Sequence, residues 1–169
     1  PKTIYLSAAL TNVDYCESHR GESFRLNVAG PAAVASAARR LGSKLIYIST
    51  DYVFDGQAGP YIEVDEPNPI NIFGEHKLSS EFIMSQSPDA LIVRTTWVYS
   101  FERTGNGKNF VQRLVSSLSN QEEVKVPVDQ IGTPTYAPDL AERIVTLALK
   151  GHAGIVHLAG SSVVTRYTF

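Results

Sequence analysis

A run of four apolar residues, Leu45–Ile48, places the strongest constraint on how this chain can fold. The polar residues Ser49, Thr50 and Asp51 follow the run directly. A short apolar run with β-branched residues and polar flanks is typical of a fully buried strand in a parallel sheet. Ligands bind at the carboxyl edge of open α/β sheets. The sequence therefore predicts a binding site at the hydroxyls and the carboxylate that end this strand.

Residues 70–86, which follow this strand after a long loop, are predicted to form a helix. Phe73 and Lys77 are four residues apart in it, so they lie one turn apart on one helix face. The chain thus combines a threonine at a strand end with an aromatic residue and a lysine on a single helix face.

Composition excludes several functional classes. The chain has 169 residues, of which 43% are hydrophobic and 19% charged, as in soluble globular proteins that bury a core. Its net charge of −2 gives no electrostatic basis for binding nucleic acid or an anionic membrane. No apolar run approaches the roughly 18 residues of a membrane helix. The single cysteine, Cys16, excludes an internal disulfide and fits a reducing compartment, so a cytoplasmic location is predicted.

Predicted strands and helices alternate along the chain. Apolar runs predict strands at 3–6, 45–49, 90–94, 123–126 and 155–158. Helical spacing of apolar residues predicts helices at 22–41, 70–86, 109–118 and 139–150. Pro31 should kink the first helix and Gly42 should end it. The alternation predicts a Rossmann-like, doubly wound α/β fold, with a mostly parallel sheet as the middle of three layers.

Long loops are predicted at 51–69, 95–107 and 128–138. Loops of such length in a compact domain are usually functional. Because the carboxyl ends of parallel strands meet at one edge of a sheet, we expect these substrate-side loops to converge there. They should form one cleft lined by Thr50, Lys77, Trp97 and Thr135. Residues 1–169 are expected to form a single Rossmann-like domain.

The sequence lacks the glycine-rich turn that normally opens a dinucleotide-binding fold. No G-x-G-x-x-G pattern occurs, although the backbone N–H groups of such a turn hold the cofactor pyrophosphate. Residues 166–169 resemble the first turn of an unfinished helix. We therefore expect the central fragment of a longer protein, without the first βαβ units and the C-terminal end of the fold.

Several separate stretches resemble a known family in their order and spacing. They are Ala8–Ala9, Thr11–Asp14 with Glu17, Asn27–Pro31, Ser49–Gly56, Pro67–Pro69 leading to Gly74 and Lys77, Arg94–Tyr99, Asp129–Thr135 and His157–Gly160. The chain resembles the extended short-chain dehydrogenase/reductases along nearly all of its length, most closely the dTDP-4-dehydrorhamnose reductases. The resemblance implies NADP- or NAD-dependent reduction of the 4-keto group of a nucleotide sugar, in dTDP-L-rhamnose biosynthesis.

The resemblance also implies roles for individual residues. Thr50 would donate a hydrogen bond to the sugar C4 carbonyl oxygen, where negative charge develops. Lys77 would bind the nicotinamide ribose and lower the pKa of a neighbouring phenol. Ala8, Ala9 and Thr11 would line the nicotinamide-ribose side of the cofactor. The residues implied on the sugar-nucleotide side are Asp51, Tyr52, Phe54, Trp97, Gln130 and Thr135.

Position 73 departs from the family pattern, because Phe73 stands where the family has its catalytic tyrosine. Phenylalanine has no proton to give to the new alkoxide, and loss of general acid catalysis slows a reaction by roughly 10²–10⁴-fold. Water, Tyr52 and His76 are the candidate replacement donors.

The sequence leaves three functional hypotheses open. The first is a nucleotide-sugar reductase, either impaired at Phe73 or using a replacement acid. The second is a non-catalytic relative that keeps the cleft as a ligand-binding or regulatory subunit. The third is a sugar epimerase or dehydratase of the same superfamily, which is weakened because those reactions usually need the same phenol.

Each candidate residue also has a purely structural interpretation. Thr50 could cap the end of its strand, Lys77 could be a solvated helix residue, and Phe73 and Trp97 could be core residues. The histidines and the acidic residues of loop 51–69 lack the paired spacing of metal ligands, so no metal site is predicted. A homodimer is left open as the oligomeric state.

Overall fold

The computed structural model describes residues 1–101 and 109–169. They form two compact units, one of residues 1–94 with 146–157 and one of residues 95–145 with 158–169. In the described ranges, none of the helices combines the length and apolar content that crossing a bilayer requires. The organisation of residues 1–169 as a single domain stays a prediction.

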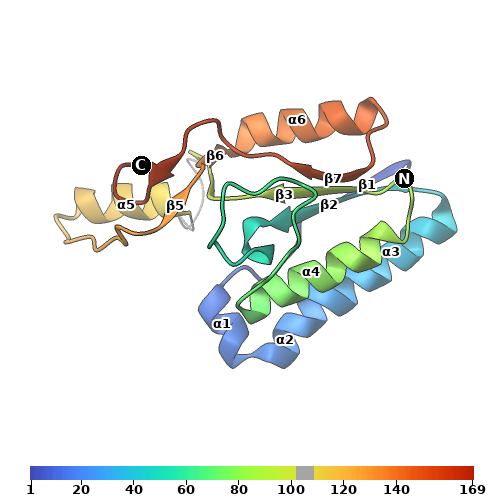
Figure 1. Ribbon diagram of the computed structural model, residues 1–169, viewed down its shortest axis with the longest axis horizontal. Helices are drawn as coiled ribbons and strands as arrows, with labels where there is room; N and C mark the ends of the chain where they lie inside the picture. The colour runs from blue at the N-terminus through green and yellow to red at the C-terminus, as the bar shows by residue number, and fades with distance from the viewer. Residues whose placement is uncertain (102–108) are drawn as a thin grey trace. The chain divides into compact units, whose positions relative to one another are not determined.

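The first unit is built on a four-stranded sheet with the order β1-β2-β3-β7 (Figure 1). Its strands are β1 (Thr3–Leu6), β2 (Lys44–Thr50), β3 (Leu91–Thr95) and β7 (Gly154–His157). β1 pairs with β2 in parallel, with Thr3 opposite Lys44, and β3 pairs with β7 in parallel, with Leu91 opposite Gly154. The Rossmann-like, mostly parallel sheet predicted from the alternating pattern is confirmed.

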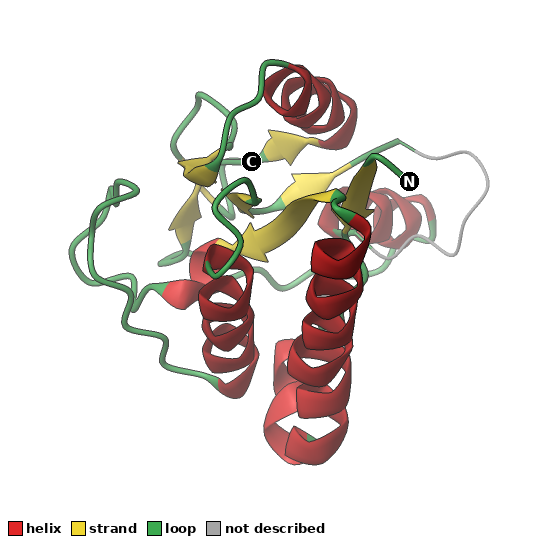
Figure 2. Ribbon diagram, turned by 90° about the vertical axis from the view of Figure 1, so that its right-hand side faces the viewer, coloured by secondary structure: helices red, strands yellow, loops and turns green. Residues whose placement is uncertain are grey.

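Helices lie on both sides of this sheet. α3 (Gly30–Leu41) and α4 (Ile72–Ser85) run side by side against one face (Figure 2). The last turn of α6 (Ala137–Leu149) lies on the opposite side, where it leads into β7 (Figure 1). The core between sheet and helices consists of fully buried apolar residues: Ala35, Ala38, Leu45, Tyr47, Met84, Ala90 and Ile92. Leu45, Ile46 and Tyr47 of the predicted run are buried, whereas Ile48 is half-buried.

The expected helix at 22–41 is divided into segments. After α1 (Val13–Ser18) come α2 (Arg20–Phe24), a π-helical turn η1 (Arg25–Ala29) and α3. Pro31 has no N–H to donate to the carbonyl of Asn27 one turn earlier, and the Ser80 hydroxyl of α4 donates to that carbonyl instead. The irregularity expected at Pro31 is therefore a π turn just before it. Gly42 ends α3 with φ 62°, as predicted.

The strand predicted at 123–126 was wrong. These residues are described, and they form neither helix nor strand. Val124 and Val126 alternate with charged residues as in a half-buried strand, but no described strand pairs with them. The alternation alone could not supply a partner.

The second unit contains short strand pairs, three strands of which lie in the regions predicted as loops. β4 (Val98–Tyr99) pairs in parallel with β6 (Thr135–Tyr136), and β5 (Ile131–Gly132) pairs antiparallel with β8 (Val164–Thr165). α5 (Phe110–Ser119) begins just after its N-cap Asn109, and α6 begins at Ala137, two residues before the predicted start. Residues 102–107 of the predicted loop 95–107 lie outside the described residues.

Candidate active site

Strand β2 ends in a tight turn that Thr50 caps. The turn is the 3₁₀ segment η2 (Asp51–Val53), and Thr50 is its N-cap. The Thr50 hydroxyl accepts a hydrogen bond from the Tyr52 backbone N–H at 3.2 Å and donates one to Asp51 Oδ1 at 3.1 Å. These are the local contacts of a capping threonine. The role of Thr50 toward a substrate stays a prediction.

The first turn of α4 docks directly on the η2 turn. Asn71 caps the helix by accepting a hydrogen bond from the Gly74 N–H at 2.8 Å. Gly74 lies so close to the η2 turn that a Cβ at this position would be 2.1 Å from the Tyr52 carbonyl oxygen. Only glycine therefore allows this approach, which places Phe73 and Lys77 beside the end of β2.

Phe73 is a buried residue at this contact. It is 5% exposed and packs with Cys16 and Ile72 in an apolar cluster. The ring of Tyr52, which is 39% exposed, meets the Phe73 ring edge-on with centroids 5.8 Å apart. The core-residue interpretation of Phe73 thus agrees with its surroundings, and Tyr52 is the phenol that contacts it.

Lys77 is also buried rather than solvated, with an exposed fraction of 3%. Its Nζ donates a hydrogen bond to the Ile48 carbonyl at 2.7 Å and lies 4.0 Å from the centroid of the Tyr47 ring. Burial lowers the pKa of the Lys77 ammonium to about 8, against an opposing effect of the nearby Glu81 carboxylate. The ammonium is therefore held at the carboxyl end of β2, two residues before Thr50.

Lys77 should make the stability of the fold depend on pH. Between about pH 8 and 10 the unfolded lysine, with a pKa of 10.5, keeps a proton that the folded one has lost. The free energy of unfolding should therefore rise with pH, by about 2 kcal/mol over this window. The window ends near pH 10, because burial raises the pKa of Tyr47 and reverses the trend above it.

Urea unfolding from pH 7 to 10 measures this effect. The rise in stability should disappear in Lys77→Met and persist in Lys150→Met, which removes the same charge from an exposed residue. Equal slopes in the parent and in Lys77→Met would contradict the buried ammonium.

The loop after β1 carries the residues expected on the cofactor side. Ala8, Ala9 and Thr11 are exposed. Asn27, which is 1% exposed, holds Leu10 of this loop through both the oxygen and the nitrogen of its side-chain amide. Its Oδ1 accepts from the Leu10 N–H and its Nδ2 donates to the Leu10 carbonyl, both at 2.9 Å. The contribution of this loop to cofactor binding stays a prediction.

Of the two side chains proposed as replacement acids, only Tyr52 lies against Phe73. The His76 Nδ1 is 2.8 Å from the Ser23 hydroxyl, and the His76 ring meets the Phe24 ring edge-on. Burial lowers the pKa of His76, which reduces the protonated fraction. The His76 side chain is thus directed toward α2. The contact of Tyr52 with Phe73 therefore favours Tyr52 as the proton donor.

In the second unit, Trp97 and Thr135 are brought together. Trp97 has φ 43°, and its carbonyl accepts a hydrogen bond from the Thr135 N–H at 3.3 Å. Gly132 lies under the indole ring, and the Arg166 guanidinium carbon lies 3.6 Å from the ring centroid. Two residues predicted from separate loops therefore share one site in this unit. Their placement in one cleft with Thr50 and Lys77 stays a prediction.

Gln130 lies with basic residues that the sequence analysis missed. It lines an open pocket of about 280 Å³ together with Phe110, Arg113, Lys125 and Arg166. Three cationic side chains and an aromatic ring suit the phosphates and base of a nucleotide. Sequence alone gave no signal, because these residues are far apart along the chain.

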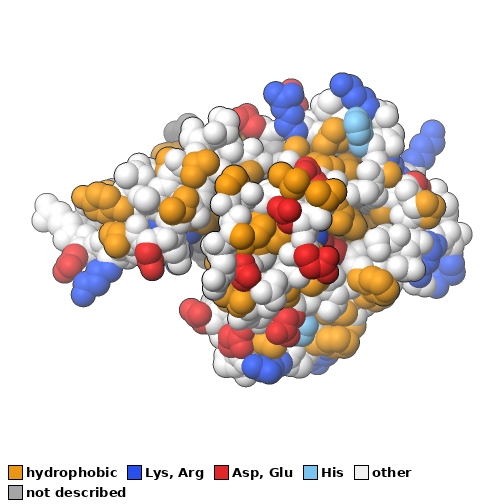
Figure 3. Space-filling view, viewed as in Figure 1, with side chains coloured by type: hydrophobic (Ala, Val, Ile, Leu, Met, Phe, Trp, Pro, Cys, Tyr) orange, Lys and Arg blue, Asp and Glu red, His pale blue; other side chains and the backbone are white. Residues whose placement is uncertain are grey.

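By contrast, loop 51–69 is acidic. It contains Asp51, Asp55, Glu63, Asp65 and Glu66 and no lysine or arginine. Figure 3 shows acidic side chains gathered over this loop. The outer face of the loop therefore does not suit a diphosphate group, and its candidate contacts are to uncharged parts of a ligand.

Sequence reasoning also missed a buried ion pair between Glu81 and Arg94, which are 3% and 4% exposed. One signal was available: Arg94 is the only charged residue in an otherwise apolar predicted strand. Lys, Arg, Asp and Glu are almost never fully buried unless they are paired. A charged residue in a buried strand therefore predicts a partner.

Comparison with known proteins identifies the family of the chain. The family model for the RmlD substrate binding domain matches residues 1–169. The chain belongs to this family. The resemblance to the extended short-chain dehydrogenase/reductases is thereby confirmed.

Several relatives of this RmlD-family chain are dTDP-4-dehydrorhamnose reductases. The dTDP-4-dehydrorhamnose reductase of Mycobacterium tuberculosis is 40% identical over 167 residues, which are 95% of this chain and 54% of that protein. Two solved structures of dTDP-4-dehydrorhamnose reductases, from Clostridium acetobutylicum and from Bacillus anthracis in complex with NADP, each have a TM-score of 0.93 and 37% identity. Each match covers 100% of this chain and 59% of the solved chain. The chain thus spans a little over half the length of these relatives.

Proposed function

We propose that this chain forms the substrate-side part of an NAD(P)H-dependent reductase that acts on dTDP-4-dehydrorhamnose. The observation that carries the proposal is the position of Lys77. Its ammonium donates a hydrogen bond to the Ile48 carbonyl at 2.7 Å, two residues before Thr50, whose hydroxyl ends the same strand. A cation and a hydroxyl at the carboxyl end of a parallel strand are suited to bind and polarise a carbonyl substrate.

The chain's own residues would prepare the carbonyl for reduction. Thr50 Oγ1 would turn from Asp51 to the sugar C4 oxygen and stabilise the negative charge that develops there. Lys77 would hold the nicotinamide ribose, and its positive charge would favour the alkoxide. Bound NAD(P)H would supply the hydride. Phe73 has no proton to give, so the product hydroxyl would take its proton from Tyr52 or from water.

Cofactor binding is proposed on the β1 side. The small, exposed residues Ala8 and Ala9 leave backbone accessible at the carboxyl end of β1, and Thr11 adds a hydroxyl in the same loop. With the Lys77 ammonium they fit the nicotinamide-ribose end of NADP or NAD. The pyrophosphate requires a glycine-rich turn, which this sequence does not contain.

Roles toward the nucleotide sugar are proposed for individual residues of each unit. Asp51, Tyr52 and Phe54 of the first unit would contact the sugar, and Trp97 and Thr135 would lie against the sugar nucleotide. Gln130 and its basic neighbours Arg113, Lys125 and Arg166 would bind the diphosphate, because these side chains converge on one pocket.

A second candidate function is a non-catalytic ligand-binding subunit. The observation that favours it is the burial of Phe73, whose ring is packed into an apolar cluster instead of presenting a polar atom. Such a protein would bind the nucleotide sugar without reducing it.

The oligomeric state is also part of the proposal. We propose that the reductase is a homodimer of chains in which residues 1–169 form one domain. The apolar outer face of α4 supports this: Phe82 is 71% exposed and lines a groove of about 560 Å³ with Leu78 and Ile83. Apolar surface of this kind is typical of protein contacts.

Single-turnover reduction tests the reductase proposal. The full-length protein, in excess over dTDP-4-dehydrorhamnose and supplied with NADPH, should oxidise NADPH slowly and only when the sugar is present. Thr50→Val should lower the rate about 10²-fold, because it removes a donor to the developing oxyanion. Thr3→Val, at the start of β1, serves as the control and should leave the rate unchanged. Equal rates for Thr50→Val and the parent would refute the role of Thr50.

A further inference from the structure

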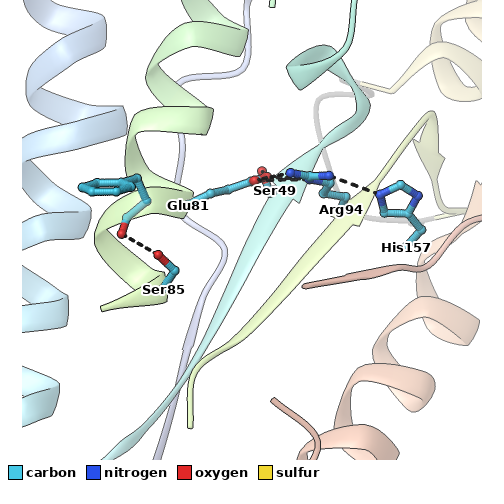
Figure 4. Close-up of polar contacts among 6 residues, drawn as sticks. Ser49, Glu81, Ser85, Arg94 and His157 are labelled. Carbon is cyan, nitrogen blue, oxygen red and sulfur yellow. Dashed lines mark hydrogen bonds and ion pairs between the residues drawn. The ribbon is translucent and has the colours of Figure 1, made fainter. Parts of the chain in front are cut away.

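Arg94 and Glu81 form a buried, hydrogen-bonded ion pair inside the first unit (Figure 4). The Arg94 Nε lies 3.1 and 3.2 Å from the two Glu81 oxygens, and Nη2 lies 2.7 Å from Oε2. The Ser49 hydroxyl donates to Glu81 Oε1. The pair therefore connects α4, β2 and β3 in one buried contact.

A buried ion pair is weak evidence for stability. Removing two charges from water opposes their attraction, and well-packed apolar residues of similar volume are often as stabilising. An apolar pair at positions 81 and 94 would therefore fill the same space. What the apolar pair would lack is a cationic group with a fixed orientation.

The guanidinium of Arg94 faces loop 51–69 as well as Glu81. Its carbon lies 5.0 Å from the centroid of the Phe54 ring, and Nη1 points to His157 Nε2 at 3.5 Å. Phe54 is 8% exposed and stacks on Tyr61 with centroids 4.2 Å apart. The contact between a cation and an aromatic ring thus fixes the loop four residues after Thr50.

Hydrogen bonds also hold the later residues of loop 51–69. The Tyr61 hydroxyl and the Asn68 amide donate to the two oxygens of Asp55. The bond from Tyr61 first, then those from the Gln57 N–H and the Asn68 amide, lower the pKa of Asp55 to about 2. Glu63 accepts a hydrogen bond from the His157 N–H at 2.8 Å. A loop of this length can adopt many conformations when nothing holds it, so these contacts determine where loop 51–69 lies.

We propose that Arg94 is a positioning residue: held by Glu81, it fixes residues 54–69 of loop 51–69 through Phe54, and so sets the shape of the loop that is proposed to contact the substrate. The expected effect of this positioning on substrate binding rests on the proposed function. The positioning itself is a property of the fold and is measured without substrate.

Hydrogen exchange in the full-length protein tests the positioning. The reporters are the amides that loop contacts protect: Gln57, bonded to Asp55, Ala58, bonded to the Tyr61 hydroxyl, and His157, bonded to Glu63. Phe54→Leu removes the ring and leaves the ion pair intact, so the variant should fold. Arg94→Lys keeps the charge and loses the planar group. Ile92→Val, a buried change on the same strand as Arg94, is the matched control for a general loss of stability.

The positioning role predicts that exchange of the three reporters accelerates at least about tenfold in Phe54→Leu and Arg94→Lys, while amides of β2 exchange as in the parent. Ile92→Val should leave the reporters unchanged. The proposal would be overturned if the reporters exchanged at the parent rate in Phe54→Leu. It would also be overturned if they exchanged as fast in Ile92→Val as in Phe54→Leu.

The catalytic consequence is a change in KM rather than in kcat. Arg94→Lys, at a residue without a proposed substrate contact, should raise KM for the nucleotide sugar about tenfold and leave kcat within about twofold, because the loop binds substrate and does not react. Faster loop exchange with an unchanged KM would overturn the link to substrate. A parent without any turnover would refute the proposed function and leave the exchange result standing.

Discussion

Phe73→Tyr is expected to raise the turnover of dTDP-4-dehydrorhamnose about 10²-fold in the full-length protein with NADPH, at the low end of general-acid effects. The new hydroxyl would lie one helical turn before Lys77, whose ammonium lowers the pKa of a nearby phenol from about 10. Since a proton donor acts in the transition state, kcat and kcat/KM should rise together and KM should change little. Steady-state kinetics of both proteins measure the effect.

The same substitution should reduce stability. Phe73 is 5% exposed and packed against Cys16, Ile72 and Tyr52, so the added hydroxyl enters a mostly apolar site. A buried polar group without a good partner destabilises by about 1–3 kcal/mol. A gain in activity together with a lower Tm would therefore be the signature of a restored acid at a position adapted to phenylalanine.

Two further variants identify the donor in the parent. Tyr52→Phe should abolish the residual parental turnover when Tyr52 is the replacement acid, and should leave it unchanged when water is the donor. Lys77→Met should reduce any turnover that remains. Unchanged turnover in Phe73→Tyr, with no parental activity for Lys77→Met to reduce, would favour the non-catalytic ligand-binding subunit.

Gly74→Ala is expected to destabilise the first unit by about 3 kcal/mol. An alanine Cβ would lie 2.1 Å from the Tyr52 carbonyl oxygen and 3.0 Å from the Pro69 Cβ, so backbone must move. Alanine gains about 1 kcal/mol of helix propensity over glycine, and the clash outweighs this gain. Because the shift separates η2 from α4, turnover should fall about 10²-fold.

Gly21→Ala is the matched control for this variant. Gly21 lies in α2, and a Cβ there would meet no atom within 4 Å. This variant should be as stable as the parent or more stable by about 0.5–1 kcal/mol. Chemical denaturation of both variants gives the comparison, and a Gly74→Ala protein with parental stability would contradict the close contact.

Local signals in the sequence were sufficient for the elements that hold the site. The apolar run Leu45–Ile48 predicted β2, and Gly42 predicted the end of α3. The spacing of Phe73 and Lys77 predicted their common helix. These predictions succeeded because each depends on residues within one or two turns of each other.

Contacts between distant residues could not be predicted in this way. The pairing of Asn27 with Leu10, of Glu81 with Arg94 and of Glu63 with His157 joins separate elements. The failed strand at 123–126 has the same cause, because a strand requires a partner that its own alternation does not specify. The burial of Lys77 also depends on distant contacts, since the Tyr47 ring and the Ile48 carbonyl that bind it belong to β2.

Transfer of deuterium from labelled cofactor tests the central claim most directly. The full-length protein, as parent and as Phe73→Tyr, is incubated with dTDP-4-dehydrorhamnose and NADPH deuterated at nicotinamide C4, and the sugar is analysed by mass spectrometry and NMR. The account predicts a dTDP-6-deoxyhexose with deuterium at C4, formed slowly by the parent and about 10²-fold faster by Phe73→Tyr. Sugar recovered without deuterium from both proteins, although both are folded and bind NADPH, would contradict it.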